Sequence, residues 1–442
     1  MSETFHPGDL RGRVLRSGGW TLARTVLVAL LQAATLIILF RLLEPDDFGA
    51  ISIVTVVLAI AQAFTQTGVD LALVREGGDV RRYLDSFWSL QVVRGVILGG
   101  IIAVLAAPIA IWQGTPLLTD YLLVASLVPI LEGLRSVSPI LFNRALDQKR
   151  PVIADSTCSI LSFGALVGLA VWLRSPWAIV INQVFSTLIR SASYHIVHPV
   201  RTRFTLRWSL LRRFARFGVG FNLSQSTRYL VDTVDRLLIG RHLGMHTLGI
   251  YDRSHVLAHY GQSQLPQFLA AVVFPGFSRV LSDPARFRRL ARRFLLTATL
   301  GGVAIAGLVR LFDEPLLAVA AGSRSPEILP FFRILLVLAV CRGIALLGHV
   351  LLDVSGRPQI QAVCNTAHVL WLVVALPFAL ATGELTIVCG VAVAGGALNA
   401  TLTLISLGAV AWARGRGSAT PSAHSRQGGT LAPAQAESTP RR

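Results

Sequence analysis

Residues 40–51 read FRLLEPDDFGAI, and residues 240–251 read GRHLGMHTLGIY. An offset of 200 residues superposes these two stretches and pairs identical residues, namely Arg41 with Arg241, Leu43 with Leu243 and Gly49 with Gly249. Further on, QKRP at 148–151 aligns with SGRP at 355–358 at an offset of 207. Matches that keep their order along the chain indicate two similar halves, as in many membrane proteins built from repeats.

The chain is hydrophobic along most of its length. Of its 442 residues, 53% are hydrophobic and 14% are charged. A helix needs about 20 mostly apolar residues to cross a membrane, and twelve such runs are present, at roughly 20–40, 49–74, 87–112, 117–142, 152–173, 176–198, 214–240, 247–275, 294–312, 327–352, 359–381 and 385–412. The predicted fold is therefore all-α, a polytopic membrane protein with about 12 transmembrane helices in two pseudo-symmetric six-helix bundles around a central cleft.

These bundles divide the chain into five parts. We expect a cytoplasmic N-terminal segment, a first bundle, a basic cytoplasmic linker, a second bundle and a cytoplasmic tail, at 1–19, 20–198, 199–213, 214–412 and 413–442. The tail is rich in Gly, Pro, Ser and Thr and has no apolar period, which is typical of disorder. Because six helices are an even number, both halves start from the same side of the membrane.

The formal net charge of +18 comes from 41 Lys and Arg against 23 Asp and Glu. In a soluble protein this excess indicates nucleic-acid binding, whereas in a membrane protein Lys and Arg collect in cytoplasmic loops. With the N-terminus inside, 23 of the loop Lys and Arg residues fall in cytoplasmic segments and five in outer loops. The sequence therefore predicts cytoplasmic termini, contact with membrane lipids, and no nucleic-acid partner.

Motifs for enzyme chemistry are missing from the sequence. The cysteines stand singly and form no CxxC pair, at Cys158, Cys341, Cys364 and Cys389. The sequence contains no GxxxxGK[ST] phosphate loop and no Gly-rich dinucleotide fingerprint. We therefore expect no cofactor, no metal and no catalytic activity, so that any transport runs on an ion gradient, the membrane potential or the substrate's own gradient.

The stretch STRYLVDTVDRLLIG, residues 226–240, places four charges inside an apolar run. A charge near the bilayer centre costs about 2.5–3.5 kcal/mol on insertion scales, so such residues face a bundle interior or a water-filled cavity. Arg228, Asp232 and Arg236 follow one another at i, i+4 and i+8. This spacing predicts a ladder of ion pairs along one side of the helix.

The repeat predicts that this ladder faces the cleft. At the offset of 200, Asp232 and Asp235 align with Gln32 and Thr35, the polar positions of an otherwise apolar span. Three roles remain open: the ladder neutralises itself and braces the helices, or its two arginines receive an anionic substrate while the aspartates orient them, or the ladder couples transport to an ion.

Further charged residues lie inside the predicted spans, at Arg94, Arg135, Arg190, Asp252, Arg253 and Arg342. Each of them alone fits an ion pair with a neighbouring helix. Together, the excess of arginine predicts a positive interior suited to phosphate groups. His255 and His259 lie one helical turn apart and follow Asp252, which fits proton or ion coupling as well as the polar lining of a cleft; an HExxH metal pattern is missing.

Residues 283–293 have a helical pattern of their own. Asp283 followed by Pro284 is a helix-start signal. Beyond it, apolar side chains alternate with basic ones, Phe287, Leu290 and Phe294 opposing Arg288, Arg289, Arg292 and Arg293. We expect an amphipathic helix on the inner membrane surface, attracted to anionic lipid.

The most family-specific stretch is LGIYDRSHVLAHYGQSQLPQFLAAVVFPGFSRVLSDPARFRRL at 248–290, supported by LLEPDDFGAISIV at 42–54 and TGVDLALVR at 67–75. In these stretches the chain resembles the polysaccharide-transporter family of oligosaccharide flippases, whose superfamily also contains the multidrug and toxic-compound extruders. The likeness covers most of residues 14–410. It implies two helical bundles that flip a polyprenyl-pyrophosphate-linked oligosaccharide to the outer leaflet of the bacterial inner membrane, with cationic cavity residues that receive the sugar or the pyrophosphate.

Resemblance and charge pattern together predict a flippase for surface polysaccharide synthesis that works by alternating access. Its expected partners are the lipid-linked oligosaccharide, membrane lipids, and a glycan polymerase or export machinery. A multidrug extruder-type cation antiporter is the first alternative and would favour an acidic, aromatic-lined cavity. A membrane-embedded polysaccharide polymerase or ligase would need a sizeable outer domain, whereas the predicted outer loops are short. A structural scaffold is the last alternative, although buried charge would add nothing to such a role.

Overall fold

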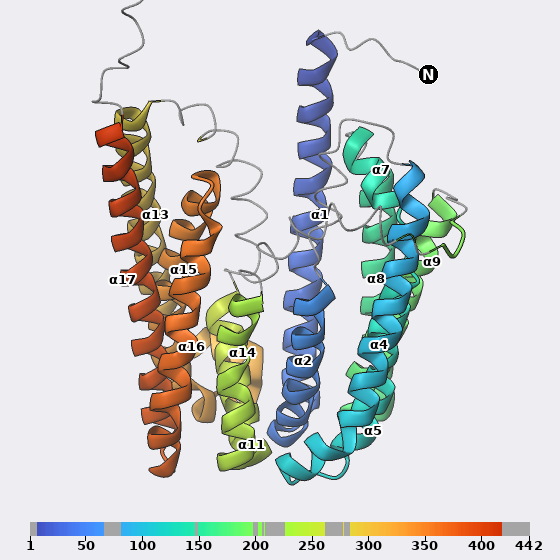
Figure 1. Ribbon diagram of the computed structural model, residues 1–442. Coiled ribbons are helices and arrows are strands. Elements are labelled where there is room, and N and C mark those ends of the chain that lie inside the picture. Colours follow the sequence, from blue (N-terminus) through green and yellow to red (C-terminus); the bar gives the residue numbers. More distant parts are fainter. Residues whose placement is uncertain are drawn as a thin grey trace, which may run out of the picture.

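The computed structural model consists of helices and short connections in the residues that it describes, which are 7–65, 81–145, 149–197, 202–205, 207, 226–260, 277 and 283–417. The first half of the chain contributes α1 (Pro7–Leu42), α2 (Pro45–Thr65), α4 (Arg81–Gln113), α5 (Leu118–Ala125), α6 (Leu127–Gly133), α7 (Ser138–Ala145), α8 (Lys149–Leu173) and α9 (Trp177–Val197). The second half contributes α11 (Val234–His259), α13 (Pro284–Leu311), α14 (Asp313–Ala321), the 3₁₀ turn η2 (Gly322–Arg324), α15 (Ser325–Val354), α16 (Pro358–Ala381) and α17 (Leu385–Gly417). The long helices run side by side, with α2 and α11 next to each other between the rest of the two halves (Figure 1).

The helices confirm the predicted all-α membrane fold. Within the described residues, eight helical stretches are long and apolar enough to span a membrane, and they match the predicted first, second, third, fifth, ninth, tenth, eleventh and twelfth spans. The sixth span is α9, and the seventh and eighth lie partly outside the described residues. Large apolar side chains such as Val104, Trp172 and Phe378 are exposed on the outside of the bundle, as contact with lipid requires.

The predicted fourth span, 117–142, is divided into the three short helices α5, α6 and α7. A turn at Ser126 separates α5 from α6, and residues 134–137 separate α6 from α7. Pro129 explains the first break, because proline has no N–H to donate to the carbonyl four residues earlier and its ring crowds that carbonyl. The Ser126 hydroxyl instead donates to the Leu123 carbonyl oxygen at 2.6 Å.

The loop expected between the seventh and eighth spans is reduced to a kink. Element α11 consists of two helical parts that meet at Gly244, whose φ of 83° and ψ of 171° are not helical. A positive φ is accessible to glycine without steric cost because it lacks a Cβ. The kink turns the chain back, so α11 contains the end of one predicted span and the start of the next.

The surface helix expected at 283–293 is not a separate element. It forms the first turns of α13, a single helix from Pro284 to Leu311, because no proline follows Arg293 before the end of this helix. The predicted start is confirmed: the Asp283 carboxylate accepts hydrogen bonds from the amides of Ala285 and Arg286. The apolar side of these turns is buried in protein, where Phe287 packs on Phe277 and close to Leu351. At the C-terminus, α17 covers residues 413–417 of the predicted tail, and the remaining tail lies outside the described residues.

The crossing of α2 and α11 confirms the internal repeat. A Cβ on Gly49 would lie 2.1 Å from the carbonyl oxygen of Met245, and a Cβ on Gly249 would lie 1.8 Å from that of Pro45. The two contacts are the same contact with its partners exchanged, since each pair is related by the offset of 200. The pairing of Asp46 with His246, 2.9 Å between Oδ2 and Nδ1, lies at the same crossing. The halves are therefore related by an approximate two-fold axis.

The two halves are held together at the end of the molecule where α1 turns into α2, the lower end in Figure 1. Here Arg41 of α1 donates to the Val319 carbonyl of α14 at 2.7 Å. Arg324 donates to the Leu43 carbonyl and lies 3.7 Å from the Glu44 carboxylate. A continuous apolar core that contains Ile53, Ile239 and Leu335 joins residues of both halves. This end is closed in the structure.

Candidate functional site

The charged stretch 226–240 is interrupted in its middle. Helical residues end at Val231, Asp232 and Thr233 form a turn, and α11 begins at Val234. The Thr233 hydroxyl donates to the Tyr229 carbonyl oxygen at 2.7 Å, a back-bond that bends helices. The φ of Thr233, −129°, is not helical. The regular i, i+4, i+8 geometry is therefore lost at this point.

The predicted ion-pair ladder is wrong for this reason. Arg236 Nε lies 2.7 Å from Asp252 Oδ1 in an ion pair within α11, and its Nη1 donates to the backbone carbonyl of Asp232 at 2.8 Å. The Asp232 carboxylate pairs instead with Arg342 of α15, 2.9 Å between Oδ1 and Nη1. The charges of the stretch are thus balanced across helices and not along one helix.

His255 lies between the two paired arginines. Its Nδ1 is 3.0 Å from Arg236 Nη2, and its Nε2 is 3.1 Å from Arg342 Nη1. A neutral imidazole has one acceptor nitrogen and one N–H, so it accepts from only one of these guanidinium groups at a time. The ring of His259 stacks on that of His255, with centroids 4.0 Å apart. The structure therefore brings Asp252, His255 and His259 together with both arginines.

We call these side chains, together with two buried neighbours, the charged cluster: Asp232, Asp235, Arg236, Tyr251, Asp252, His255, His259 and Arg342. Asp235 is its most deeply buried carboxylate. Asp235 is buried, and its Oδ2 accepts a hydrogen bond of 2.6 Å from the hydroxyl of fully buried Tyr251. The side chain of Asp232 is 48% exposed, whereas that of its partner Arg342 is 13% exposed. The cluster is therefore accessible mainly from the side of Asp232.

Arg228 is half-buried and lies one helical turn before Asp232, whose amide donates to the Arg228 carbonyl oxygen at 3.3 Å. Within the described residues, no carboxylate forms an ion pair with it. Its guanidinium carbon lies 5.8 Å from the ring centre of Tyr229. The positive charge of the guanidinium group also attracts the carboxylate of Asp353, without a direct ion pair. Within the described residues, Arg236 of the stretch 226–240 therefore has an ion pair with a carboxylate, whereas Arg228 has none.

Arg253 is buried at the contact between α11 and the residues that join α1 to α2. Its side chain is 1% exposed. The guanidinium donates to the Leu43 carbonyl oxygen at 2.9 Å and lies 4.4 Å from the ring centre of Phe48 and 5.5 Å from that of Phe40. These contacts join α11 to α1 and α2, so Arg253 helps to hold the closed end together. At the offset of 200, its equivalent in the first half is Ile53.

The remaining predicted arginines lie in the first half. Arg94 is on α4, Arg135 follows α6, and Arg190 is on the exposed side of α9. All three act electrostatically on the half-buried carboxylate of Glu132. They form a second group, which belongs to other elements than the charged cluster. Within the described residues, no group of three or more His, Cys, Asp or Glu side chains has the arrangement of a metal site.

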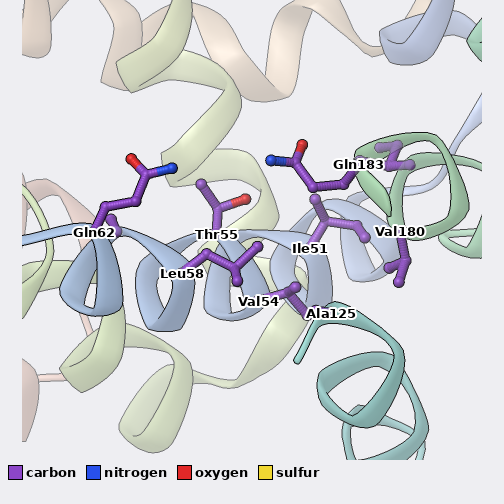
Figure 2. A pocket seen from close by; sticks show the side chains of 10 residues that line it. Ile51, Val54, Thr55, Leu58, Gln62, Ala125, Val180 and Gln183 are labelled. Carbon is purple, nitrogen blue, oxygen red and sulfur yellow. The ribbon is translucent and has the colours of Figure 1, made fainter. Parts of the chain in front are cut away.

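The first half also contains a pocket that the sequence reasoning missed (Figure 2). It has a volume of about 120 Å³ and is lined by α2, α5 and α9. Its polar side chains are Thr55, Gln62 and Gln183, and Figure 2 shows Thr55 between the two glutamines. A signal was present in the sequence, since Thr55 and Gln62 are seven residues apart on one side of an otherwise apolar helix and the repeat aligns Thr55 with His255.

Comparison with known proteins identifies the family. The sequence profile described as "Polysaccharide biosynthesis protein" matches residues 38–330. The chain belongs to this polysaccharide biosynthesis protein family. Its match covers the α2–α11 crossing and most of the charged cluster, and it confirms the resemblance seen in the sequence.

Two relatives carry names that refer to polysaccharide biosynthesis. Succinoglycan biosynthesis transport protein ExoT of Rhizobium meliloti is 24% identical over 333 residues, which cover 75% of this chain and 66% of ExoT, just under two thirds. Lipopolysaccharide biosynthesis protein WzxC of Escherichia coli is 20% identical over 360 residues, covering 76% of this chain and 69% of WzxC.

Solved structures share the fold of this family member. An inward-facing multidrug resistance MATE family transporter of the MOP superfamily superposes with a TM-score of 0.69 at 16% identity, covering 89% of this chain and 95% of the other. The lipid II flippase MurJ, in an inward closed conformation, has a TM-score of 0.69 at 11% identity, covering 89% and 87%. An outward-facing MATE family transporter has a lower TM-score, 0.54 at 16% identity, covering 89% and 96%.

Proposed function

We propose that the protein is a flippase that moves a polyprenyl-pyrophosphate-linked oligosaccharide across the bacterial inner membrane for surface polysaccharide synthesis. The family and the names of its relatives support the pathway. The observation that carries the proposal is the charged cluster, in which Arg342 is paired with the exposed carboxylate of Asp232. Arg228, one helical turn before Asp232, adds an arginine that has no described carboxylate partner. The protein acts as a transporter and performs no chemistry on the lipid.

The cluster suits a pyrophosphate because its pairing is exchangeable. An incoming phosphate oxygen takes the place of the Asp232 carboxylate on Arg342, while Arg228 supplies a second positive charge. Guanidinium groups bind phosphate through parallel N–H donors and are more weakly hydrated than ammonium groups, which favours them inside a membrane protein. Arg236 stays with Asp252 and orients His255, so it positions the site.

Two related halves suit alternating access, in which one half rocks against the other. With the termini in the cytoplasm, the lower end in Figure 1 faces the outside, and its contacts close the outer side of the protein. The higher TM-score with inward-facing than with outward-facing MATE transporters supports this assignment. Transport then requires the contacts at the closed end to separate while the opposite end closes.

Asp252, His255 and His259 are our candidates for ion coupling. His255 takes up a proton only by giving up its acceptor contact with one of the two arginines. Such a step would loosen the cluster at the moment when substrate leaves, and would link transport to a proton gradient. Transport assays with and without an imposed pH gradient test this part of the proposal separately.

The function is tested with purified protein in liposomes that contain polyprenyl-pyrophosphate oligosaccharide from the host. Translocation to the other leaflet is expected in the wild type, and loss of translocation in Arg228→Ala with normal insertion and folding. No translocation of any host lipid-linked oligosaccharide would refute the flippase, whereas normal transport by Arg228→Ala would assign Arg228 to bracing. Transport of organic cations in the same liposomes would favour the multidrug antiporter.

A further inference from the structure

The two halves carry equivalent helix faces with different chemistry. The reciprocal contacts of Gly49 and Gly249 fix the equivalence of α2 with the second part of α11 at 200 residues. With this register, Tyr251, His255 and His259 of the charged cluster correspond to Ile51, Thr55 and Ala59, which line the pocket of the first half. The pocket is therefore the counterpart of the charged cluster on the other side of the two-fold axis.

The pocket is polar but uncharged among the described residues that line it. It contains one hydroxyl, from Thr55, and two carboxamides, from Gln62 and Gln183, while the remaining lining is aliphatic, from Ile51, Val54, Leu58, Ala59, Ala125, Ile179 and Val180. The two carboxamides come from different helices, α2 and α9, and lie on either side of Thr55 in Figure 2. An anion in this pocket would have no cation to offset its loss of hydration.

Uncharged carbohydrate matches this lining. A carboxamide offers two donors and an acceptor, and a hydroxyl offers both roles, so the three side chains pair with sugar hydroxyls whichever way these point. The aliphatic residues pack on the C–H faces of a sugar ring. The pocket is small, with a volume of about 120 Å³, so it takes at most one sugar ring at a time and not a chain of several sugars.

We propose that this pocket binds an uncharged sugar ring of the lipid-linked oligosaccharide while the charged cluster binds its pyrophosphate. This inference rests on the proposed function and deepens it. The asymmetry between the halves then separates two tasks: the second half recognises the anionic link that all such lipids share, and the first half recognises the glycan. Selectivity among glycans resides in α2 and α9.

The test compares two lipids and three variants in binding and translocation assays. The lipids are the polyprenyl-pyrophosphate oligosaccharide and the same polyprenyl pyrophosphate without sugar. Gln183→Leu and Thr55→Val remove polar groups from the pocket with little change of volume, and Gln359→Leu makes the same change as the first at an exposed position of α16. Thermal unfolding in detergent shows whether each variant is folded.

We expect Gln183→Leu to weaken binding of the glycosylated lipid about ten-fold and Thr55→Val about five-fold, from the loss of one or two hydrogen bonds. Binding of the sugar-free lipid is expected to stay unchanged in both, and Gln359→Leu is expected to behave as the wild type with either lipid. Equal weakening for both lipids, or none for either, overturns the sugar pocket while leaving the flippase intact. A wild type that binds neither lipid overturns the flippase and the pocket together.

Discussion

Replacing Gly249 by alanine tests the α2–α11 crossing directly. The added Cβ would lie 1.8 Å from the Pro45 carbonyl oxygen, 2.5 Å from its carbon and 3.0 Å from its Cα. All three atoms belong to the backbone, so no side-chain rotation relieves the overlap. Since carbon contacts are most favourable at about 3.5–4.0 Å, α2 has to move away by about 1.5 Å or more.

This movement raises the free energy of the conformation in which the two helices touch. Overpacking of a well-packed core costs about 1–3 kcal/mol, and the backbone overlap places Gly249→Ala at the upper end of this range. A penalty of about 3 kcal/mol shifts a two-state equilibrium roughly 100-fold or more. We therefore expect the variant to leave the closed-end conformation, with transport impaired because one of the two states is lost.

Crosslinking across the crossing measures this shift. Cysteines at positions 46 and 246, in a background without the native cysteines, replace the Asp46–His246 pair that lies at the crossing. Gly249→Ala is expected to lower the crosslinking yield strongly, and Gly49→Ala likewise because its Cβ would lie 2.1 Å from the Met245 oxygen. The matched control is Gly164→Ala on α8, where a Cβ meets nothing within 4 Å. Equal yields in Gly249→Ala and Gly164→Ala would refute the close approach.

Three further predictions follow from the charged residues. Arg342→Gln is expected to weaken binding of polyprenyl pyrophosphate ten-fold or more, whereas Asp232→Asn, which frees Arg342 from its pair, is expected to strengthen it; titration of both variants with the same lipid checks the opposite signs. Tyr251→Phe removes the 2.6 Å hydrogen bond to buried Asp235 and is expected to lower the free energy of unfolding by about 1–3 kcal/mol, seen as a lower melting temperature in detergent, whereas an unchanged melting temperature would count against that bond. Arg253→Met removes the hydrogen bond to Leu43 and the contact with Phe48, and we expect it to lower the free energy of unfolding by about 3 kcal/mol. Binding of polyprenyl pyrophosphate by the folded variant is expected to persist. A loss of binding at unchanged stability would instead support a role of Arg253 in the substrate cavity.

The placement of the helices was predictable from hydropathy because lipid imposes a length requirement on each helix separately. About 20 apolar residues are needed whatever the neighbouring helices are, and the predicted spans therefore agree with α1, α4, α8 and α17. The division of the fourth span was also readable in part, since Pro129 lies in its middle. The repeat was visible because Gly49 and Gly249 meet backbone atoms and cannot change without moving a helix.

The pairing of charges was not predictable in the same way. The ladder of Arg228, Asp232 and Arg236 assumed a straight helix, and the turn at Asp232 and Thr233 removes that assumption. Arg342 lies 110 residues after Asp232 in the sequence, and no local pattern relates the two. Arg253 looked like the other intramembrane arginines, although its neighbours Phe40 and Phe48 come from helices far away in the chain.

The sequence by itself determined that this protein crosses the membrane many times, that it consists of two related halves, and that charges are buried in the second half. Only the tertiary structure decided which charges neutralise one another, which arginine remains without a described carboxylate partner, and that the uncharged pocket is the counterpart of the charged cluster. The physical reason is that insertion into lipid depends on the apolar content of single segments. Ion pairs and pockets depend on which segments, distant in the sequence, the fold brings together.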